Sequence, residues 1–374
     1  MKTEIVAAIH DRRLRDRHPA DRGGLEARAT AAAVELLRKG EVVALPTETV
    51  YGLAADALNP FAVAKNFEAK ERPRFDPLIV HLPDKQWLER VANVDNCSRA
   101  QIERLIARFW PGPLTLVLDR QPIIPEIVTA GLDTVAVRMS SHPVFAEIIS
   151  TFGKPVAAPS ANRFGRISPT TAQHVFDELN GRIPLIIDAG PTTHGIESTI
   201  IAVRDKNIDI LRRGPITEEH LADFGGSHFV REPNSVSAPG QLPSHYAPKT
   251  PLRLIDKAES FAPVKNHRVG LLAWNAKPRK GDLQIAPRRT LLRRDYGGRA
   301  GERRSLKFAA VRYLSEHQDL REAAANLFRC LRELDELNLE LIVAERVPAR
   351  GLGAAILDRL ERASHDSDIR DTHG

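Results

Sequence analysis

The 374-residue sequence has few cysteines and no long apolar run. Its two cysteines, Cys97 and Cys330, lie in separate predicted domains, which excludes a disulfide framework and a cysteine metal site. No apolar run approaches the roughly 20 residues that span a bilayer, and the N-terminal apolar stretch is too short for a signal peptide. We therefore expect a cytoplasmic protein without membrane contact, whose fold depends on packing alone.

Familiar phosphate-binding and metal-binding motifs are also missing. The P-loop pattern is absent, and the sequence around Gly351 and Gly353 lacks the third glycine of a dinucleotide fingerprint, so it more simply marks a helix start. The 13 histidines form neither the spaced pair of a zinc protease nor a cluster with cysteine. We expect no transition metal held by the protein.

Positive charge is in modest excess, with 54 Lys and Arg against 48 Asp and Glu. Such a balance suits an anionic partner, either a nucleotide or a nucleic acid, although it also occurs on surfaces that only confer solubility. Residues 263–312 concentrate 14 basic against 3 acidic side chains, yet few aromatic residues are interleaved to stack on RNA bases. A solvated basic loop is the favoured interpretation, and RNA contact is the alternative.

Hydrophobic periodicity predicts a first α/β (α+β) domain over residues 25–215, preceded by a flexible arm at residues 1–24. Helix starts are marked by Asn59-Pro60, and by Thr170 with Gln173 as a capping box. Short β-branched runs predict strands at residues 42–45, 78–82, 115–118, 134–138, 185–188 and 199–203.

A proline-rich segment, residues 216–250, predicts an ordered linker or lid. Beyond it, buried strands at residues 269–274 and 341–344 and an amphipathic helix at 322–337 indicate a smaller α/β domain over residues 251–362. The polar residues 363–374 are expected to form a disordered tail.

Polar and cationic groups occur where predicted strands give way to loops, the usual position of ligands in open α/β sheets. Lys70 and Arg72 near a helix C-terminus would alone be read as complements to the helix dipole. Thr134 and Arg138 lie four residues apart and so share one face of a strand. Further hydroxyl, amide and cationic groups come from residues 45–52, 159–162, 197–199 and 212.

Several independent blocks carry a family resemblance. In chain order they are PTETVYGLAADA, FEAKERPRFDPLIVH, FWPGPLTLVL, TVAVRMSSHP, APSAN, ESTI and PGQLPSHYAP. The sequence resembles L-threonylcarbamoyladenylate synthase of the long type from about Leu25 to Leu360, most strongly before residue 250. The resemblance implies a YrdC-like twisted open sheet with a concave basic cleft, followed by a smaller Rossmann-like α/β domain.

Members of that family condense L-threonine, bicarbonate and ATP into threonylcarbamoyl-AMP and release pyrophosphate. The product passes to downstream tRNA-modification proteins that make threonylcarbamoyladenosine. The resemblance therefore implies a nucleotidyltransferase whose Mg²⁺ is carried with ATP rather than held in a protein cage. The alternative, from charge alone, is an RNA-binding or tRNA-binding module without catalysis, and a weak contact with tRNA is left open.

Carried over residue by residue, the resemblance implies a threonine site made of Thr49, His81, Arg138, Ala158 and Ser198. It implies that ATP meets Arg72, Asp76, Thr134, Ser160, Asn162, Ser168, Arg212 and Tyr246. Lys70 and Arg72 take the catalytic roles, because fixed cations stabilise charge on the phosphate oxygens.

One position departs from the family pattern, and one lies far from the others in sequence. Asp76 stands where the family usually has Asn; an ionised carboxylate cannot donate a hydrogen bond and repels phosphate, so we expect Asp76 to face magnesium, the ribose or solvent. Tyr246 lies in the proline-rich linker, which predicts that this segment closes over the nucleotide.

Overall fold

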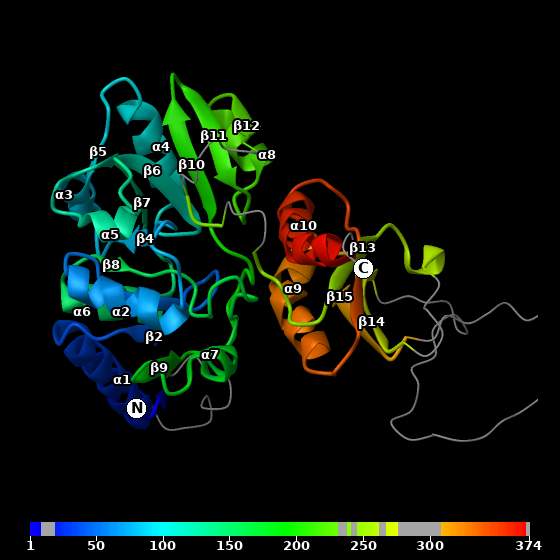
Figure 1. The fold of residues 1–374 in the computed structure, drawn as a ribbon. Helices are drawn as coiled ribbons and strands as arrows, with labels where there is room; N and C mark the ends of the chain where they lie inside the picture. The colour runs from blue at the N-terminus through cyan, green and yellow to red at the C-terminus, as the bar shows by residue number, and fades with distance from the viewer. Residues whose placement is uncertain (9–18, 231–237, 241–244, 262–266, 276–307, 372–374) are drawn as a thin grey trace, which may run out of the picture. The chain divides into compact units, whose positions relative to one another are not determined.

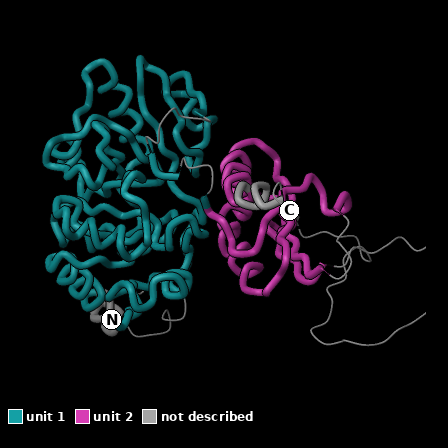
Figure 2. Tube along the Cα trace, in the orientation of Figure 1, with its two compact units in different colours: residues 1–245 teal, residues 246–374 magenta. Residues whose placement is uncertain are grey.

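The computed structural model describes residues 1–8, 19–230, 238–240, 245–261, 267–275 and 308–371. The chain divides into two compact units, residues 1–245 and 246–374, drawn in different colours in Figure 2. Most of the basic stretch at residues 263–312 lies outside the described residues.

The first unit is a mixed α/β unit built on one large sheet (Figure 1). In chain order its elements are β1 (Glu4–Ala7), α1 (Pro19–Arg38), β2 (Val43–Leu45), β3 (Gly52–Asp56), α2 (Pro60–Lys70), β4 (Ile79–His81), η2 (Lys85–Trp87), α3 (Leu88–Val91), β5 (Ala92–Asn93), α4 (Arg99–Phe109), β6 (Leu114–Arg120), α5 (Glu126–Thr129), β7 (Thr134–Arg138), α6 (Pro143–Phe152), β8 (Val156–Ala157), α7 (Ala172–Leu179), β9 (Leu185–Asp188), β10 (Thr199–Arg204), β11 (Asn207–Arg212), α8 (Glu218–Leu221), η3 (Ala222–Phe224) and β12 (Ser227–Phe229).

The sheet has the strand order β1-β9-β2-β3-β8-β4-β7-β6-β10-β11-β12, with β5 added beside β6. Parallel and antiparallel pairs alternate through its middle, since β4 runs parallel to β7, β7 antiparallel to β6, and β6 parallel to β10. This mixed order brings segments far apart in the sequence to neighbouring strand ends. The predicted strands of the first domain are confirmed within a residue or two at their ends.

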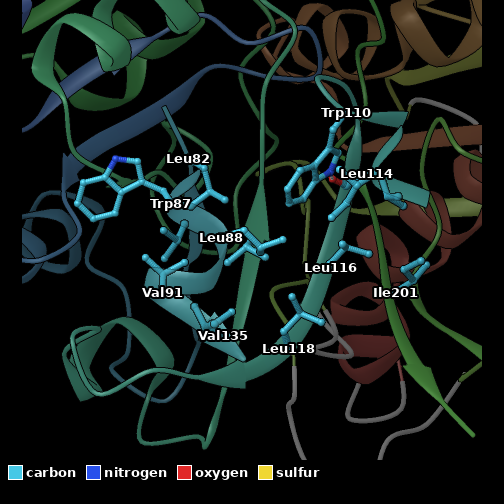
Figure 3. Packing of buried hydrophobic residues seen from close by; sticks show 14 of the residues in the cluster. Leu82, Trp87, Leu88, Val91, Trp110, Leu114, Leu116, Leu118, Val135 and Ile201 are labelled. Carbon is cyan, nitrogen blue, oxygen red and sulfur yellow. Dashed lines mark hydrogen bonds between the residues drawn. The ribbon is translucent and has the colours of Figure 1, made fainter. Parts of the chain in front are cut away.

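Helices bury the two faces of the sheet unequally. Around β2, β3 and β9, helices α1 and α6 pack on one face and α2 and α7 on the other. Farther along, α3, α4 and α5 pack on one face of β4, β6, β7 and β10, with Trp87, Trp110, Leu116 and Val135 in that core (Figure 3). The opposite face there forms a cluster to which no described helix contributes, made of Ile79, Val117, Ala136, Ile200, Ala202, Leu211 and Ala238. We call it the helix-free face.

Local sequence signals explain some element ends and misplace others. Asn59 caps α2 as predicted, because its Oδ1 accepts from the first-turn amides. The capping box predicted from Thr170 and Gln173 is wrong by one residue, since Thr171 is the N-cap of α7 and accepts from the amide of His174.

The ends of the chain hold more regular structure than the composition predicts. Residues 4–7 of the expected arm form β1, because this short apolar run pairs in parallel with β9. Within the predicted linker, α8, η3 and β12 form before the chain leaves the first unit, and β12 pairs with β11. The last helix continues to Asp371, beyond the start of the predicted tail.

The second unit is a four-stranded parallel sheet in the order β13-β16-β14-β15, packed with two helices. Its elements are β13 (Leu252–Ile255), η4 (Ala258–Ser260), β14 (Val269–Asn275), β15 (Ala310–Ser315), α9 (Leu320–Asp335), β16 (Leu341–Glu345) and α10 (Leu352–Asp371). The predicted strands and amphipathic helix of this unit are confirmed as β14, β16 and α9. Among the described residues, no helix is long and apolar enough to cross a membrane.

Candidate active site

The helix-free face carries polar side chains at the ends of its strands. Residues two apart on a strand share a face, so the apolar residues of this face continue into His81, Thr115 and Arg138, and Ser198 directly precedes β10. His81 and Arg138 are direct neighbours on β4 and β7, and the hydroxyls of Thr115 and Ser198 lie 2.8 Å apart. Strand pairing therefore brings together three of the residues expected around threonine.

Arg138 is buried in a network with the loop between β2 and β3. Its Nη2 donates to Glu48 Oε1 at 2.6 Å, and its Nη1 donates to Thr49 Oγ1 at 3.1 Å. Ser140 donates to the other carboxylate oxygen of Glu48. The same loop is stabilised by Thr47, whose hydroxyl lies 2.8 Å from that of Thr49. Thr49 and Arg138 thus meet directly, and Glu48 joins them.

The charges in this network are nearly balanced. Burial opposes ionisation of Glu48, but the positive charge of Arg138 and the Ser140 hydroxyl hold its pKa below the ordinary value. Burial and the nearby Arg138 charge hold the pKa of His81 well below its usual range. At neutral pH the network therefore contains one anion, one cation and a neutral imidazole.

The residues of the PSAN block lie against the same loop. The Ala158 amide donates to the Ile79 carbonyl at 2.9 Å, and a Cβ on Gly52 would approach that of Ala158 to 3.3 Å. Ser160 forms an isolated β-bridge with Gly52. Ala158 therefore lies beside the residues expected around threonine, and the Ser160 carbonyl contacts the Lys70 ammonium group.

Lys70, the last residue of α2, is buried, and its ammonium group contacts the loop that follows β8. Its Nζ donates to the carbonyls of Ser160 and Asn162, each at 2.5 Å. Burial and the neighbouring Arg72 charge hold its pKa well below the usual range, opposed by Asp76 and Glu178. Among the described residues, the hydrogen bonds of this ammonium group go to neutral carbonyls, so an anion placed beside it would be strongly stabilised.

Arg72 and Asp76 form a buried ion pair, with Nη2 and Oδ2 2.8 Å apart. Arg72 also donates to the Pro77 carbonyl at 2.9 Å. Burial raises the pKa of Asp76, opposed by the charges of Arg72, Lys70 and Arg212. The expectation that Asp76 could face solvent is wrong, because its side chain is fully buried and paired with Arg72.

Arg212 connects the cations to Ser198. Its Nε donates to the Ser198 carbonyl at 3.1 Å, its Nη2 to the Ser198 hydroxyl at 3.0 Å, and its Nη1 to the Pro239 carbonyl at 3.3 Å. Gly214 follows closely, and a Cβ there would come within 2.4 Å of the Thr199 amide. This close approach of backbones requires glycine and fixes Arg212 against the start of β10.

Two further ATP candidates, Ser168 and Asn162, belong to the loop between β8 and α7. The Ser168 hydroxyl donates to Glu197 Oε1 at 2.5 Å, which links this loop to the segment before β10. The Asn162 amide donates to the carbonyls of Arg163 and Arg166 at 2.7 and 2.9 Å. Both side chains are buried and hold the loop in shape.

Thr134 and Tyr246 lie outside the contacts described so far, one at the far end of its strand and the other in the second unit. Thr134 lies at the opposite end of β7 from Arg138, about 13 Å away for four residues of strand. Tyr246 belongs to the second unit, where its ring stacks on Phe328 at 5.5 Å and lies 5.6 Å from the Arg359 guanidinium. A role for either residue at the nucleotide stays a prediction.

Sequence reasoning missed several supporting residues. Glu48, Thr115 and Glu197 each bond directly to a predicted site residue, and Ser140 bonds to Glu48. Three of them are partly indicated by the sequence. Glu48 and Glu197 lie inside the blocks that carry the family resemblance, and Thr115 lies two residues before Val117 on the same face of the predicted strand. No signal pairs Glu48 with Arg138, which lies 90 residues away.

The donor set does not form a metal site of its own. Among the residues that the structure describes, no three His, Cys, Asp or Glu side chains gather closely enough to hold a metal ion. Asp76, the carboxylate nearest the cations, is already paired with Arg72. The described side chains thus provide cations and hydroxyls for an anionic ligand rather than a cage for a cation.

Comparisons with known proteins cover nearly the whole chain. A domain family shared by Sua5, YciO and YrdC, described as "Telomere recombination", matches residues 35–214, and the threonylcarbamoyl-AMP synthase C-terminal domain matches residues 216–365. The chain is 39% identical to threonylcarbamoyl-AMP synthase of Bacillus subtilis, over 91% of this chain and 94% of that protein. It is 37% identical to the protein of that name from Pyrococcus abyssi, over 89% and 93% of the two chains.

Solved structures agree with this match. The crystal structure of P. abyssi Sua5 complexed with L-threonine superposes with a TM-score of 0.77 at 33% identity, covering 97% of this chain and 98% of that one. A second structure of P. abyssi Sua5, in which an adjacent His and Tyr are both replaced by Ala, gives a TM-score of 0.77 at 32% identity, covering 97% and 96% of the two chains.

Proposed function

The chain belongs to the threonylcarbamoyl-AMP synthase family, and from this premise we propose that its first unit joins ATP, L-threonine and bicarbonate into L-threonylcarbamoyladenylate and releases pyrophosphate. The observation that carries the proposal is the presence of two groups of buried charged side chains in the first unit, connected through the hydrogen bonds of Arg212 to Ser198. One is the Arg138 network, suited to a small zwitterion. The other is the set of three cations around Asp76, suited to a polyphosphate.

In the proposed reaction, the threonine amine first combines with bicarbonate to form a carbamate, and water leaves. A carbamate oxygen then attacks the α-phosphorus of ATP, and the bond from that phosphorus to the bridging oxygen breaks as pyrophosphate departs. No protein side chain needs to form a covalent intermediate. The enzyme has to hold two anions together, and positioning alone can contribute roughly 7 to 11 kcal/mol.

Each group of side chains has a distinct part in this step. Arg138 would bind the threonine carboxylate, with Thr49, His81, Ala158 and Ser198 around the rest of the amino acid. Lys70, Arg72 and Arg212 would offset the repulsion between carbamate and phosphates and stabilise the charge that develops on the phosphate oxygens. The remaining ATP candidates Thr134, Ser160, Asn162 and Ser168 would contact the nucleotide farther from the reacting phosphorus.

Mg²⁺ would enter with ATP, bound by phosphate oxygens and water. It would neutralise charge on the leaving pyrophosphate. Asp76 is expected to act on Arg72 rather than on this ion, because the two side chains are already paired.

The linker is supported as part of the nucleotide site by contacts within the first unit. Ala238 packs into the helix-free cluster, and Arg212 donates to the Pro239 carbonyl. His245 packs edge-to-face on Phe164, whose amide donates to the Lys70 carbonyl. The chain has one adjacent His and Tyr, His245 and Tyr246, the same two residue types that are replaced in the P. abyssi variant structure. The closing of this segment over ATP remains a proposal.

The decisive experiment measures pyrophosphate release by the full chain. We expect release that requires threonine, bicarbonate and Mg²⁺ together, and labelled bicarbonate should appear in a nucleotide product. Binding of tRNA without any such turnover would instead favour an RNA-binding module. Passing the product to downstream tRNA-modification proteins is part of the same proposal and is tested by adding those proteins and tRNA to the reaction.

A further inference from the structure

The loop that carries Thr49 also carries a buried carboxylate to which the reaction proposed above gives no role. Glu48 is 5% exposed and lies between Arg138 and Ser140. A buried charge is costly unless it is paired and hydrogen-bonded. If this position only had to be filled, an apolar side chain would do so at lower cost. The buried carboxylate of Glu48 therefore needs another explanation.

Both oxygens of this carboxylate are held. Oε1 accepts from Arg138 Nη2 at 2.6 Å, and Oε2 accepts from the Ser140 hydroxyl, which itself accepts from the His142 amide at 3.2 Å. The backbone carbonyl of Glu48 accepts from the His194 amide at 2.9 Å. Two of these four hydrogen bonds reach the carboxylate itself, and the partners come from two segments, residues 138–142 and residue 194. The carboxylate is therefore held in place and can act as a rigid anchor for the arginine that it binds.

What it binds is the guanidinium expected to meet threonine. A guanidinium presents five N–H donors in a fixed plane. In Arg138, Nη2 is bonded to Glu48 and Nη1 to Thr49, while Nε is buried and has no hydrogen-bond partner among the described residues. Both terminal nitrogens of the guanidinium therefore have a partner, and the Nε–H group is left as a buried donor for a ligand.

We propose that Glu48, supported by Ser140, is the positioning residue of the threonine site: it fixes the plane of the Arg138 guanidinium so that its remaining N–H groups meet the amino-acid carboxylate. The inference rests on the proposed function. Glu48 touches neither the reacting carbamate nor the phosphates. Its effect passes through Arg138, because an arginine free to rotate loses the geometric advantage of a two-point contact with a carboxylate.

Exchanging Glu48 tests this role with separate Michaelis constants for the two substrates. Glu48→Gln keeps the volume and one acceptor but removes the charge, whereas Glu48→Ala removes both. We expect the threonine KM to rise about 10-fold in the first and about 100-fold in the second, with the ATP KM changed less than about twofold, because only the threonine contact is disturbed. Ser140→Ala should give a smaller rise in the threonine KM.

A double-variant comparison separates positioning from general support of the fold. Arg138→Lys keeps the charge but lacks the planar fork, so adding Glu48→Gln to it should raise the threonine KM little further. Glu41→Gln is the matched control, since Glu41 forms a 2.6 Å ion pair with Lys65 at the protein surface and should leave both constants unchanged.

Three outcomes would overturn the proposal. They are an unchanged threonine KM in Glu48→Gln, an equal rise of both Michaelis constants, and full additivity with Arg138→Lys. Since Glu48→Gln preserves side-chain volume, it remains informative even if Glu48→Ala fails to fold. Loss of threonine-dependent pyrophosphate release in the unaltered chain would contradict the proposed function instead, so the two failures are distinguishable.

Discussion

The two ends of the candidate site handle charge in opposite ways. At the Arg138 end, one cation faces one carboxylate and a neutral imidazole, so the charges balance before any ligand binds. At the Lys70 end, the charges of three cations, Lys70, Arg72 and Arg212, act on the carboxylate of Asp76. A zwitterionic amino acid needs orientation more than attraction, whereas a polyphosphate needs positive charge to offset its own. The difference matches the two proposed substrates.

The largest expected effect comes from removing cations at the nucleotide end. Lys70→Ala or Arg72→Ala should lower kcat/KM for pyrophosphate release on the order of 10²- to 10³-fold, because each removes a fixed charge from the phosphate site. Circular dichroism should show an unchanged fold. A loss of kcat/KM below tenfold would mean that the Lys70 end of the site depends on charge no more than the Arg138 end does.

A smaller effect of opposite sign is expected at Asp76. Asp76→Asn restores the residue that the family usually has and removes the anion that neutralises part of this cluster. The ATP KM should fall about 3- to 10-fold, while the threonine KM should not change. If the ATP KM rises instead, Asp76 holds Arg72 as Glu48 is proposed to hold Arg138, and the contrast between the two ends disappears.

The smallest expected effect is the number of protons that the protein takes up when ATP binds. Burial and Arg72 hold the pKa of Lys70 below its ordinary value of 10.5, and a bound polyanion should raise it, so ATP binding should take up a fraction of a proton in the alkaline range below 10.5. Calorimetry in buffers of different ionisation enthalpy measures this uptake. Lys70→Met should abolish it, and binding of threonine should show none.

The same shift predicts how stability depends on pH without ligand. The unfolded state binds more protons at Lys70 than the folded state does, so this residue favours folding progressively more as pH rises from its folded pKa toward 10.5. Glu48 acts at the other end of the pH scale. Its folded pKa is lowered, so its contribution is present above the ordinary pKa of 4.5 and is lost as pH falls through the folded value.

Much of the fold follows from local sequence pattern. The apolar β-branched runs of β4, β6, β7 and β10 were predictable, because strands buried on both faces read as continuous hydrophobic segments. Strand β8 has two residues, too few to show a period, and β11 mixes charged with apolar residues at its ends. Strand β1 was hidden in a charged stretch because its stability comes from pairing with β9.

The sequence indicated several of the polar side chains that the structure brings together, but not their partners. The strand-end blocks indicated Lys70, Arg138 and Ser198, since polar residues at such positions are unusual in a sheet core. Their partners are set by tertiary pairing, and Glu48 and Arg138 are joined by the sheet rather than by sequence neighbourhood. The burial of Asp76 was likewise not predictable from sequence, because it depends on how the folded chain places this residue against Arg72.

The described cover of the helix-free face has a consequence for access to the site. Elsewhere in the first unit whole helices lie over the sheet, but among the described residues outside the strands this face is contacted by Val230 and Ala238, and the Pro239 carbonyl accepts from Arg212. Breaking contacts of single residues costs less than unfolding a helix. We therefore expect a ligand to be admitted by a local rearrangement rather than by movement of the strands.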